Sequence, residues 1–237
     1  MPTPFQFKQF TIHQDACAMK VGTDSVLLGA WTSLEHEPNT ILDIGAGTGI
    51  LALMMAQRSN AENIEAIEID ADAYEQCVSN FEISSWADRL FCYHAGLDEL
   101  VAEMEIAYDL IIANPPYFTE NNTAKNTARD LARRNDALPF SELIESAAKL
   151  LSPTGEFAVI IPHKEFTVFA KLAQDQNLFA NRVTHVRGTA SSPIKRTLLQ
   201  LSFTETSTPT EILIIEEVRH TYTNAYTLLT KDFYLKM

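Results

Sequence analysis

The sequence predicts an α/β fold, with a mostly parallel sheet covered by helices on both faces. The main observation is that short apolar runs alternate with helical patterns along most of the chain, which is typical of successive strand–helix–strand units. The second is that the last apolar runs follow one another without a long helix between them. That spacing favours an antiparallel strand at one edge of the sheet.

Each element follows from its own local pattern. Apolar runs predict the first strands, at residues 41–44, 64–69, 90–94, 108–113 and 157–161. The stretches between them predict helices, at residues 49–59, 71–83, 141–151 and 164–175. Ser141 is expected to cap its helix, and Pro153 with Gly155 to end it. Two more runs, at residues 182–186 and 197–203, complete a seven-stranded sheet, and residues 212–218 are a further candidate strand.

Composition sets the broad class of the protein. The chain has 237 residues, of which 46% are hydrophobic and 21% charged, as in a single globular domain. We expect residues 1–35 to form an N-terminal cap and residues 36–237 to form the core, because the strand–helix pattern begins only after the first 35 residues. The formal net charge of −13 argues against non-specific coating of nucleic acid or of an anionic membrane.

The sequence gives no sign of a membrane partner or an obligatory metal. No apolar run approaches the length of a membrane span, and the start, MPTPFQFKQF, lacks the regions of a signal peptide. The three cysteines, Cys17, Cys77 and Cys92, form neither a CxxC pair nor a Cys/His cluster. We therefore expect a cytoplasmic protein with reduced thiols.

A glycine-rich loop, Asp43-Ile-Gly45-Ala-Gly47-Thr-Gly49, follows the first predicted strand. Its glycines permit a tight turn and a close approach of the backbone to a ligand. Glu68 stands at the end of the next strand, where a carboxylate accepts hydrogen bonds from the hydroxyl groups of a ribose. The GxGxG spacing differs from the GxGxxG of dinucleotide folds, and together with Asp43 it favours S-adenosylmethionine over NAD as the ligand.

The segment Asn114-Pro115-Pro116-Tyr117 follows the fourth predicted strand. A planar amine or carboxamide nitrogen is a poor nucleophile, because its lone pair is delocalised. The side-chain oxygen of Asn114 and the carbonyl oxygen of Pro115 would accept its two hydrogens and stabilise the charge that develops during methyl transfer. The prolines fix the backbone, and Tyr117 would stack on a planar base. The segment therefore predicts methyl transfer to an NH₂ nitrogen.

Together, these motifs resemble those of the Rossmann-like class I methyltransferases that act on an amino nitrogen. Residues 7–15, 19–31 and 217–235 are in addition similar to the valine-tRNA adenine N6-methyltransferases, which modify tRNA position 37. The resemblance covers essentially the whole chain. The glycine-rich loop is shared with very many methyltransferases, and the Asn-Pro-Pro-Tyr tetrad with DNA, RNA and protein-glutamine enzymes. Only these ranges near the two ends of the chain, residues 7–31 and 217–235, therefore point to this family.

The resemblance implies that S-adenosyl-L-methionine is the cofactor and that residues 20–24 close over it. The candidate cofactor residues are then Lys20, Thr23, Asp43, Gly45, Gly47, Gly49, Glu68 and Asn114. Taken from the residues alone, Thr23 or Asp24 is also a candidate cap of the helix that follows.

One segment departs from the family pattern. Related enzymes often carry an acid after the third strand that contacts the adenine of the cofactor. That position falls here on Gly96 or Leu97, with Asp98 next to them. We therefore assign no side chain to this contact.

A tRNA partner requires positive charge near the pocket, in spite of the acidic total. One basic group follows the tetrad and would share one face of a helix: Lys125, Arg129 and Arg133, with Arg134 beside them. The other lies in a stretch without acidic residues, from 176 to 204: Arg182, Arg187, Lys195 and Arg196. Tyr117 and Phe118 are the candidates for stacking on an extruded base.

Other functions stay open at this point. Protein-glutamine methyltransferases use the same acceptors, but they usually carry a sizeable helical domain before the glycine-rich loop, where this chain has 42 residues. A non-catalytic S-adenosylmethionine-binding module would need the loop and not the tetrad. A DNA adenine methyltransferase normally needs a larger target-recognition region. The sequence leaves open the tRNA, the nucleotide and the oligomeric state.

Overall fold

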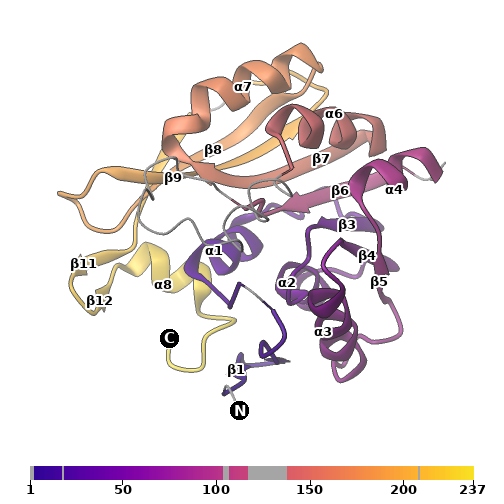
Figure 1. The fold of residues 1–237 in the computed structure, drawn as a ribbon. Coiled ribbons are helices and arrows are strands. Elements are labelled where there is room, and N and C mark those ends of the chain that lie inside the picture. The colour runs from indigo at the N-terminus through magenta and orange to yellow at the C-terminus, as the bar shows by residue number, and fades with distance from the viewer. Residues whose placement is uncertain (1–2, 18, 104–106, 117–137, 208) are drawn as a thin grey trace, which may run out of the picture.

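The computed structural model describes residues 3–17, 19–103, 107–116, 138–207 and 209–237. Within these ranges, eight strands form one central sheet (Figure 1). From edge to edge they are β10 (Thr210–Ile214), β8 (Phe179–Arg187), β9 (Ile194–Ser202), β7 (Leu151–Pro162), β6 (Tyr108–Ala113), β3 (Thr40–Ile44), β4 (Asn63–Glu68) and β5 (Leu90–His94). All neighbours are parallel except β9, which is antiparallel to β7 and β8. The predicted mostly parallel α/β sheet is confirmed.

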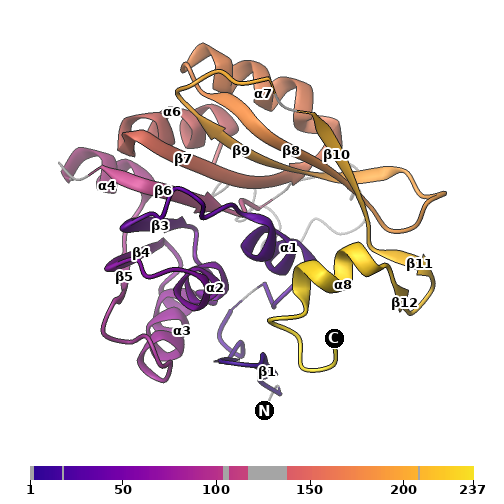
Figure 2. The same ribbon diagram turned by 180° about the vertical axis from the view of Figure 1, so that it is seen from behind.

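Helices cover both faces of this sheet (Figures 1 and 2). One face carries α1 (Thr23–Trp31), α2 (Ile50–Arg58), α3 (Ala71–Glu82) and α8 (Asn224–Thr230). The other carries α4 (Leu97–Glu103), α6 (Phe140–Leu150) and α7 (Phe166–Asp175), which follows a short 3₁₀ turn, η1 (His163–Glu165). None of the helices in the described ranges is long and apolar enough to cross a bilayer.

The strand sequences explain burial on both faces. In β3, Ile41 enters the core beneath α1 and α2, whereas Leu42 and Ile44 enter the core beneath α4 and α6. Strand β6 repeats this division with Leu110 and Ile111. Because successive side chains of a strand point to opposite faces, an uninterrupted apolar run suits a strand that is covered on both sides.

The antiparallel strand and the sheet edge differ from the prediction. The expected antiparallel pair is present as β8 and β9, but β9 lies inside the sheet and not at its edge. An eighth strand, β10, pairs in parallel with β8 and forms that edge, because the chain crosses over β8 after β9 instead of ending there. Figure 2 shows β10 beside β8.

The start and end of α6 also differ from the prediction. Its N-cap is Pro139 and not Ser141, and no side chain caps it. Strand β7 begins directly at Leu151 and runs through Pro153 and Gly155, with an irregularity in its pairing to β6 there. A Cβ atom at Gly155 would lie 2.6 Å from the carbonyl oxygen of Tyr108, so glycine lets two strands approach closely where it was expected to break a helix.

The two ends of the chain pack against each other. Short strands β1 (Phe5–Gln6) and β2 (Thr11–Ile12) form a hairpin near the N-terminus, and β11 (Glu216–Val218) and β12 (Thr221–Tyr222) form another before α8. Phe7 forms an antiparallel bridge with Tyr234, and the N–H of Lys8 donates to the carbonyl oxygen of Phe233 at 2.8 Å. Figure 2 shows the N- and C-termini side by side below α1 and α8.

Candidate active site

Strand register brings three predicted site residues to one edge of the sheet. Ile44, the last residue of β3, pairs with Ile67 of β4 on one side and with Ala113 of β6 on the other. The residues that follow, Gly45, Glu68 and Asn114, therefore leave three neighbouring strands at the same level, roughly 5 Å from strand to strand. The strand order also reverses between β3 and β6, and ligands of open α/β sheets bind at such a point.

The glycine-rich loop divides into an open part and a packed part. Gly45 and Gly47 have φ angles of 72° and 55°, and a Cβ atom on either would meet nothing within 4 Å. A Cβ atom on Gly49 would instead lie 2.6 Å from the Phe81 ring and 2.8 Å from the Cys77 sulfur, both on α3. Gly45 and Gly47 thus offer bare backbone to a ligand, whereas Gly49 lets α2 pack on α3.

Glu68 ties the end of β4 to this loop. Its Oε2 atom accepts the N–H of Gly47 at 2.8 Å, and its Oε1 atom accepts the N–H of Asp70 at 2.9 Å. Asp70 in turn caps α3 by accepting the N–H of Ala73 at 2.9 Å. The carboxylate is half-buried at the edge where a ribose was expected, and it fixes the loop in position.

Asp43 lies fully buried behind the loop. Its Oδ2 atom accepts the N–H of Ala52 in α2 at 3.1 Å, and its Oδ1 atom has no hydrogen-bond partner among the described residues. Burial, together with the nearby charge of Glu68, raises the pKa of Asp43 to about 7. A buried acceptor without a partner is a place where a bound polar group or a water completes the hydrogen bonding.

Asn114 is half-buried at the end of β6, and its amide is held by a distant helix. Its Nδ2 atom donates to the hydroxyl of Ser25 in α1 at 2.9 Å. Pro115 is buried and Pro116 is exposed. Sequence reasoning missed Ser25, because the contact spans 89 residues and a serine in the first turn of a helix carries no signal of it.

The start of α1 differs from the expected capping. The N-cap is Gly22, without a side-chain hydrogen bond, so neither Thr23 nor Asp24 caps the helix. Asp24 instead accepts from the Arg196 side chain at 2.7 Å, a partly exposed ion pair between α1 and β9. Lys20 and Thr23 are exposed beside this helix end.

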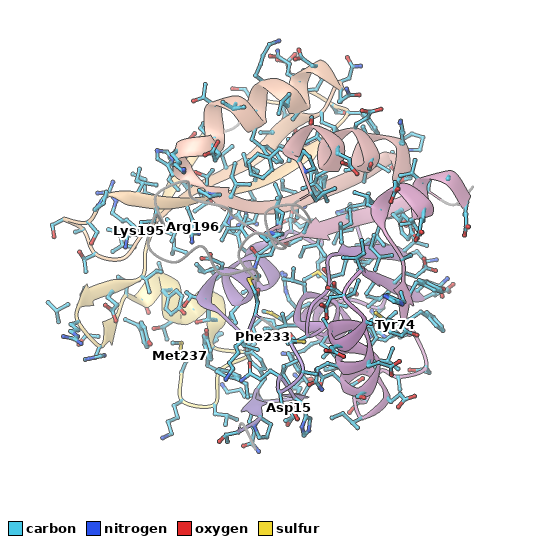
Figure 3. All side chains as sticks on the ribbon, viewed as in Figure 1. Asp15, Tyr74, Lys195, Arg196, Phe233 and Met237 are labelled. Carbon is cyan, nitrogen blue, oxygen red and sulfur yellow. The ribbon has the colours of Figure 1, made fainter. Side chains whose placement is uncertain are left out.

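The late basic residues have different partners. Arg187 ends β8 and Arg196 pairs with Pro162 at the end of β7, so both lie on the edge of the sheet that carries Asn114. Lys195 is exposed next to Arg196, and Figure 3 shows the two labelled at the start of β9. Arg182, in contrast, lies over the Trp31 ring at 4.5 Å, where it stabilises the packing of α1.

Several predicted residues lie outside the described ranges, namely Tyr117, Phe118, Lys125, Arg129, Arg133 and Arg134. The uncertain segment after the third strand is described: α4 begins at Leu97, and the N–H of Gly96 donates to Glu99 at 3.0 Å. Leu97 is buried and Asp98 is exposed. The position where related enzymes carry an acid for the cofactor adenine is therefore the start of a helix here.

Comparison with known proteins settles the family. Residues 18–174 match the family model of the methyltransferase small domain. A tRNA1(Val) (adenine(37)-N6)-methyltransferase of Flavobacterium psychrophilum is 57% identical over 98% of this chain and 100% of that protein. The protein of that name from Parabacteroides distasonis is 44% identical over 98% of both chains. The chain belongs to this family of methyltransferases.

Solved structures agree with this methyltransferase fold. A structure described as a predicted O-methyltransferase from Agrobacterium tumefaciens has a TM-score of 0.65 at 17% identity, over 89% of this chain and 96% of its own. TYW2 of Pyrococcus horikoshii, solved with MeSAdo, has a TM-score of 0.57 at 15% identity, over 84% of this chain and 70% of its own. The predicted class I methyltransferase fold is therefore confirmed.

The residues at the sheet edge fit S-adenosyl-L-methionine, the methyl donor of this class of enzyme. The open backbone at Gly45 and Gly47 accommodates a ligand in close contact, Glu68 supplies a carboxylate, and Asp43 supplies a buried oxygen without a partner. Among the residues that the structure describes, no group of three or more His, Cys, Asp or Glu side chains is placed to hold a metal ion. All three cysteines are free thiols.

Proposed function

We propose that this methyltransferase transfers a methyl group to the exocyclic N6 amine of an adenosine in tRNA, at position 37 of valine tRNA. The observation that carries the proposal is the position of Asn114, one strand away from the glycine-rich loop and in register with it. The names of the relatives supply the nucleic acid and the nucleotide.

The acceptor residues act on the amine. The Oδ1 atom of Asn114 and the carbonyl oxygen of Pro115 accept the two N6 hydrogens, which draws the nitrogen toward a tetrahedral shape and exposes its lone pair. The same oxygens stabilise the positive charge that develops on the nitrogen. The surplus proton leaves after the nitrogen has reacted, so no strong general base is needed.

Ser25 orients the Asn114 amide for this task. An amide has one face that donates and one that accepts, and only the oxygen is useful to an incoming NH₂ group. Because the Ser25 hydroxyl receives the Nδ2 donor, the oxygen is directed away from α1. Ser25 therefore acts as a positioning residue through Asn114.

The cofactor residues hold the methyl donor against the amine. S-adenosylmethionine, when bound, supplies a methyl group on a sulfonium sulfur. Gly45 and Gly47 allow its close approach, Glu68 binds its ribose hydroxyls, and Lys20 and Thr23 border it from the start of α1. Holding donor and acceptor in line supplies most of the rate enhancement.

The RNA is held by positive charge on the same edge of the sheet. Arg187, Lys195 and Arg196 contact phosphates from the ends of β8 and β9, and Tyr117 stacks on the extruded adenine. Residues 125–134 add a second basic group. The whole chain, including the cap at residues 1–35, works as one catalytic unit in the cytoplasm.

Methyl transfer from labelled S-adenosylmethionine tests the proposal. The acceptors are unmodified total tRNA, duplex DNA and a glutamine-containing protein extract, with Asn114→Ala alongside. We expect label only in tRNA, recovered as N6-methyladenosine and lost in the variant. Label in protein alone would reject the RNA substrate and keep the acceptor chemistry, whereas bound cofactor without transfer to any acceptor would reject the enzyme.

A further inference from the structure

A hollow lies between the two ends of the chain, next to the start of α1. Its volume is about 650 Å³, within the range of small-molecule pockets. Phe5, Tyr222, Tyr226 and Tyr234 line it with aromatic rings, and Thr23 and Gly188 lie on its border. Neither the glycine-rich loop nor Asn114 lines this hollow, so it adjoins the place assigned to the methyl donor at Thr23 and otherwise has a lining of its own.

The tyrosines form a packed wall with one accessible ring. Tyr226 is buried and lies 5.1 Å from the Tyr222 ring, and the ring of Tyr234 lies 6.3 Å from that of Phe5. Burial and the neighbouring Tyr234 raise the pKa of Tyr226, so its phenol stays neutral. Tyr222 is 45% exposed, which leaves part of its ring open to a planar ligand.

The hollow and the Asn114 site lie on different sides of the start of α1. Thr23 borders the hollow, and Ser25, two residues later in the same helix, holds Asn114. Two residues of a helix rise about 3 Å along its axis but are turned by about 200°, so Thr23 and Ser25 point to different sides of α1. On the other side, Gly188 directly follows Arg187, and its carbonyl oxygen accepts the N–H of Glu216 at 2.8 Å. A polynucleotide that extends from Asn114 along this edge to Arg187 therefore reaches the border of the hollow at Gly188.

The polar groups of the hollow suit a base better than a phosphate. The Glu216 carboxylate lines it, and its Oε1 atom accepts the N–H of His220 at 3.1 Å, so this wall carries a carboxylate, which is an acceptor for amino or imino hydrogens. Lys236 also lines the hollow, so charges of both signs are present and the hollow has no excess of positive charge for a phosphate. Aromatic faces together with a hydrogen-bond acceptor are the usual means of holding an unstacked base of single-stranded RNA.

We propose that this hollow binds an unpaired nucleobase of the RNA loop that carries the target adenosine. This inference rests on the proposed function and adds a determinant of substrate choice to it. The hollow is built mainly from the N-terminal hairpin, the start of α1 and the tail after β11, and Figure 3 labels Phe233 and Met237 on that tail. Most of these residues lie outside residues 18–174, the stretch that matches the methyltransferase small domain.

The first test compares Tyr222→Ala with Tyr93→Ala. Tyr93 is 43% exposed on β5, at the far edge of the sheet, and so is a matched control for loss of an exposed ring. We expect Tyr222→Ala to raise the KM for tRNA about 5- to 100-fold, as for loss of one stacked base, with kcat and cofactor affinity unchanged. Tyr222→Phe and Tyr93→Ala should behave as the wild type.

The second test removes the base instead of the ring. Each unpaired loop nucleotide of an anticodon stem-loop, other than the target adenosine, is replaced in turn by an abasic ribose. We expect one abasic position to weaken binding to the wild type and to have no effect on Tyr222→Ala, because both changes remove the same contact. Equal effects of every abasic position on both proteins would overturn the proposal.

The remaining outcomes separate the two proposals. If the wild type transfers no methyl group to tRNA, the proposed function fails. If it does so and Tyr222→Ala keeps the wild-type KM, only the base pocket is refuted. Thermal unfolding of each variant identifies a folding defect. If Tyr222→Ala has such a defect, the KM for tRNA of Tyr222→Leu is compared with that of Tyr222→Phe. Leucine keeps an apolar side chain without an aromatic face, so a raised KM for Tyr222→Leu alone supports base stacking, and equal KM values refute it.

Discussion

The two halves of the catalytic edge hold their functional groups in different ways. On the cofactor side, Glu68 binds the backbone of Gly47, and the N–H groups of Gly45 and Ala46 both donate to Ile67, so the loop is fixed by its own neighbourhood. On the acceptor side, Asn114 is held by Ser25, from a helix 89 residues earlier in the chain.

This difference separates binding from chemistry. The cofactor side depends on a short segment of backbone, which a single glycine pattern encodes. The acceptor side depends on the docking of α1, which in turn rests on packing against α2 and α8 and on the ion pair of Asp24 with Arg196. We therefore expect changes on the two sides to affect different measurable quantities.

The largest expected effect is that of Asn114→Ala on the rate. Loss of a positioned polar group in a transition state costs about 100- to 1000-fold in kcat. The glycine-rich loop is held by Glu68 and Ile67 and not by this side chain, so cofactor affinity should fall much less than kcat. Single-turnover methyl transfer and a cofactor titration measure the two quantities. A variant that transfers at the wild-type rate would exclude Asn114 from the acceptor role.

Substitutions in the loop should divide along its open and packed parts. Gly49→Ala places a methyl group against Phe81 and Cys77 in a left-handed conformation, and it should lower the free energy of unfolding by about 2–5 kcal/mol. Gly45→Ala incurs only the backbone strain, about 1–2 kcal/mol, but intrudes on the ligand. Urea unfolding and cofactor titration of both variants check this. Equal stability losses would contradict the division.

The buried Asp43 should make stability depend on pH. Its pKa is raised from 3.8 to about 7, so the native state binds more protons than the unfolded state in that interval. The free energy of unfolding should therefore fall as the pH rises from about 4 to 7, by up to roughly 1.4 kcal/mol per pH unit. Urea unfolding of the wild type and Asp43→Asn at pH 5, 6 and 7 measures the two slopes. If the free energy of unfolding had the same dependence on pH in both proteins, the pKa of Asp43 would not be raised by folding.

The smallest expected effect is that of Ser25→Ala. One neutral hydrogen bond contributes about 0.5–1.5 kcal/mol, which corresponds to a loss of about 2- to 13-fold in kcat without a change in cofactor affinity. Ser25→Thr keeps the hydroxyl and should restore most of the rate. If Ser25→Thr were as slow as Ser25→Ala, while both fold normally, the hydroxyl would not be the positioning group.

Local patterns account for what the sequence could predict. Strand–helix alternation along the chain predicts the parallel sheet. The glycine spacing, Glu68 and the Asn114 segment each lie at the end of their own strand or in the turn that follows it. Parallel pairing then brings these strand ends together. The candidate strand at residues 212–218 overlaps β10, but the parallel pairing of β10 with β8, the position of β9 inside the sheet and the start of α6 depend on pairing and packing between distant segments. For the same reason, the sequence could not show that Ser25 meets Asn114 or that Tyr222 and Phe5 line one hollow.

A double-mutant cycle tests the central claim most directly. Single-turnover methyl transfer to tRNA is measured for the wild type, Ser25→Ala, Asn114→Ala and the double variant. Since Ser25 acts only through Asn114, adding Ser25→Ala to the Asn114→Ala variant should cause no further loss of rate. A double variant slower than Asn114→Ala by the full Ser25→Ala factor would show that the two residues act independently.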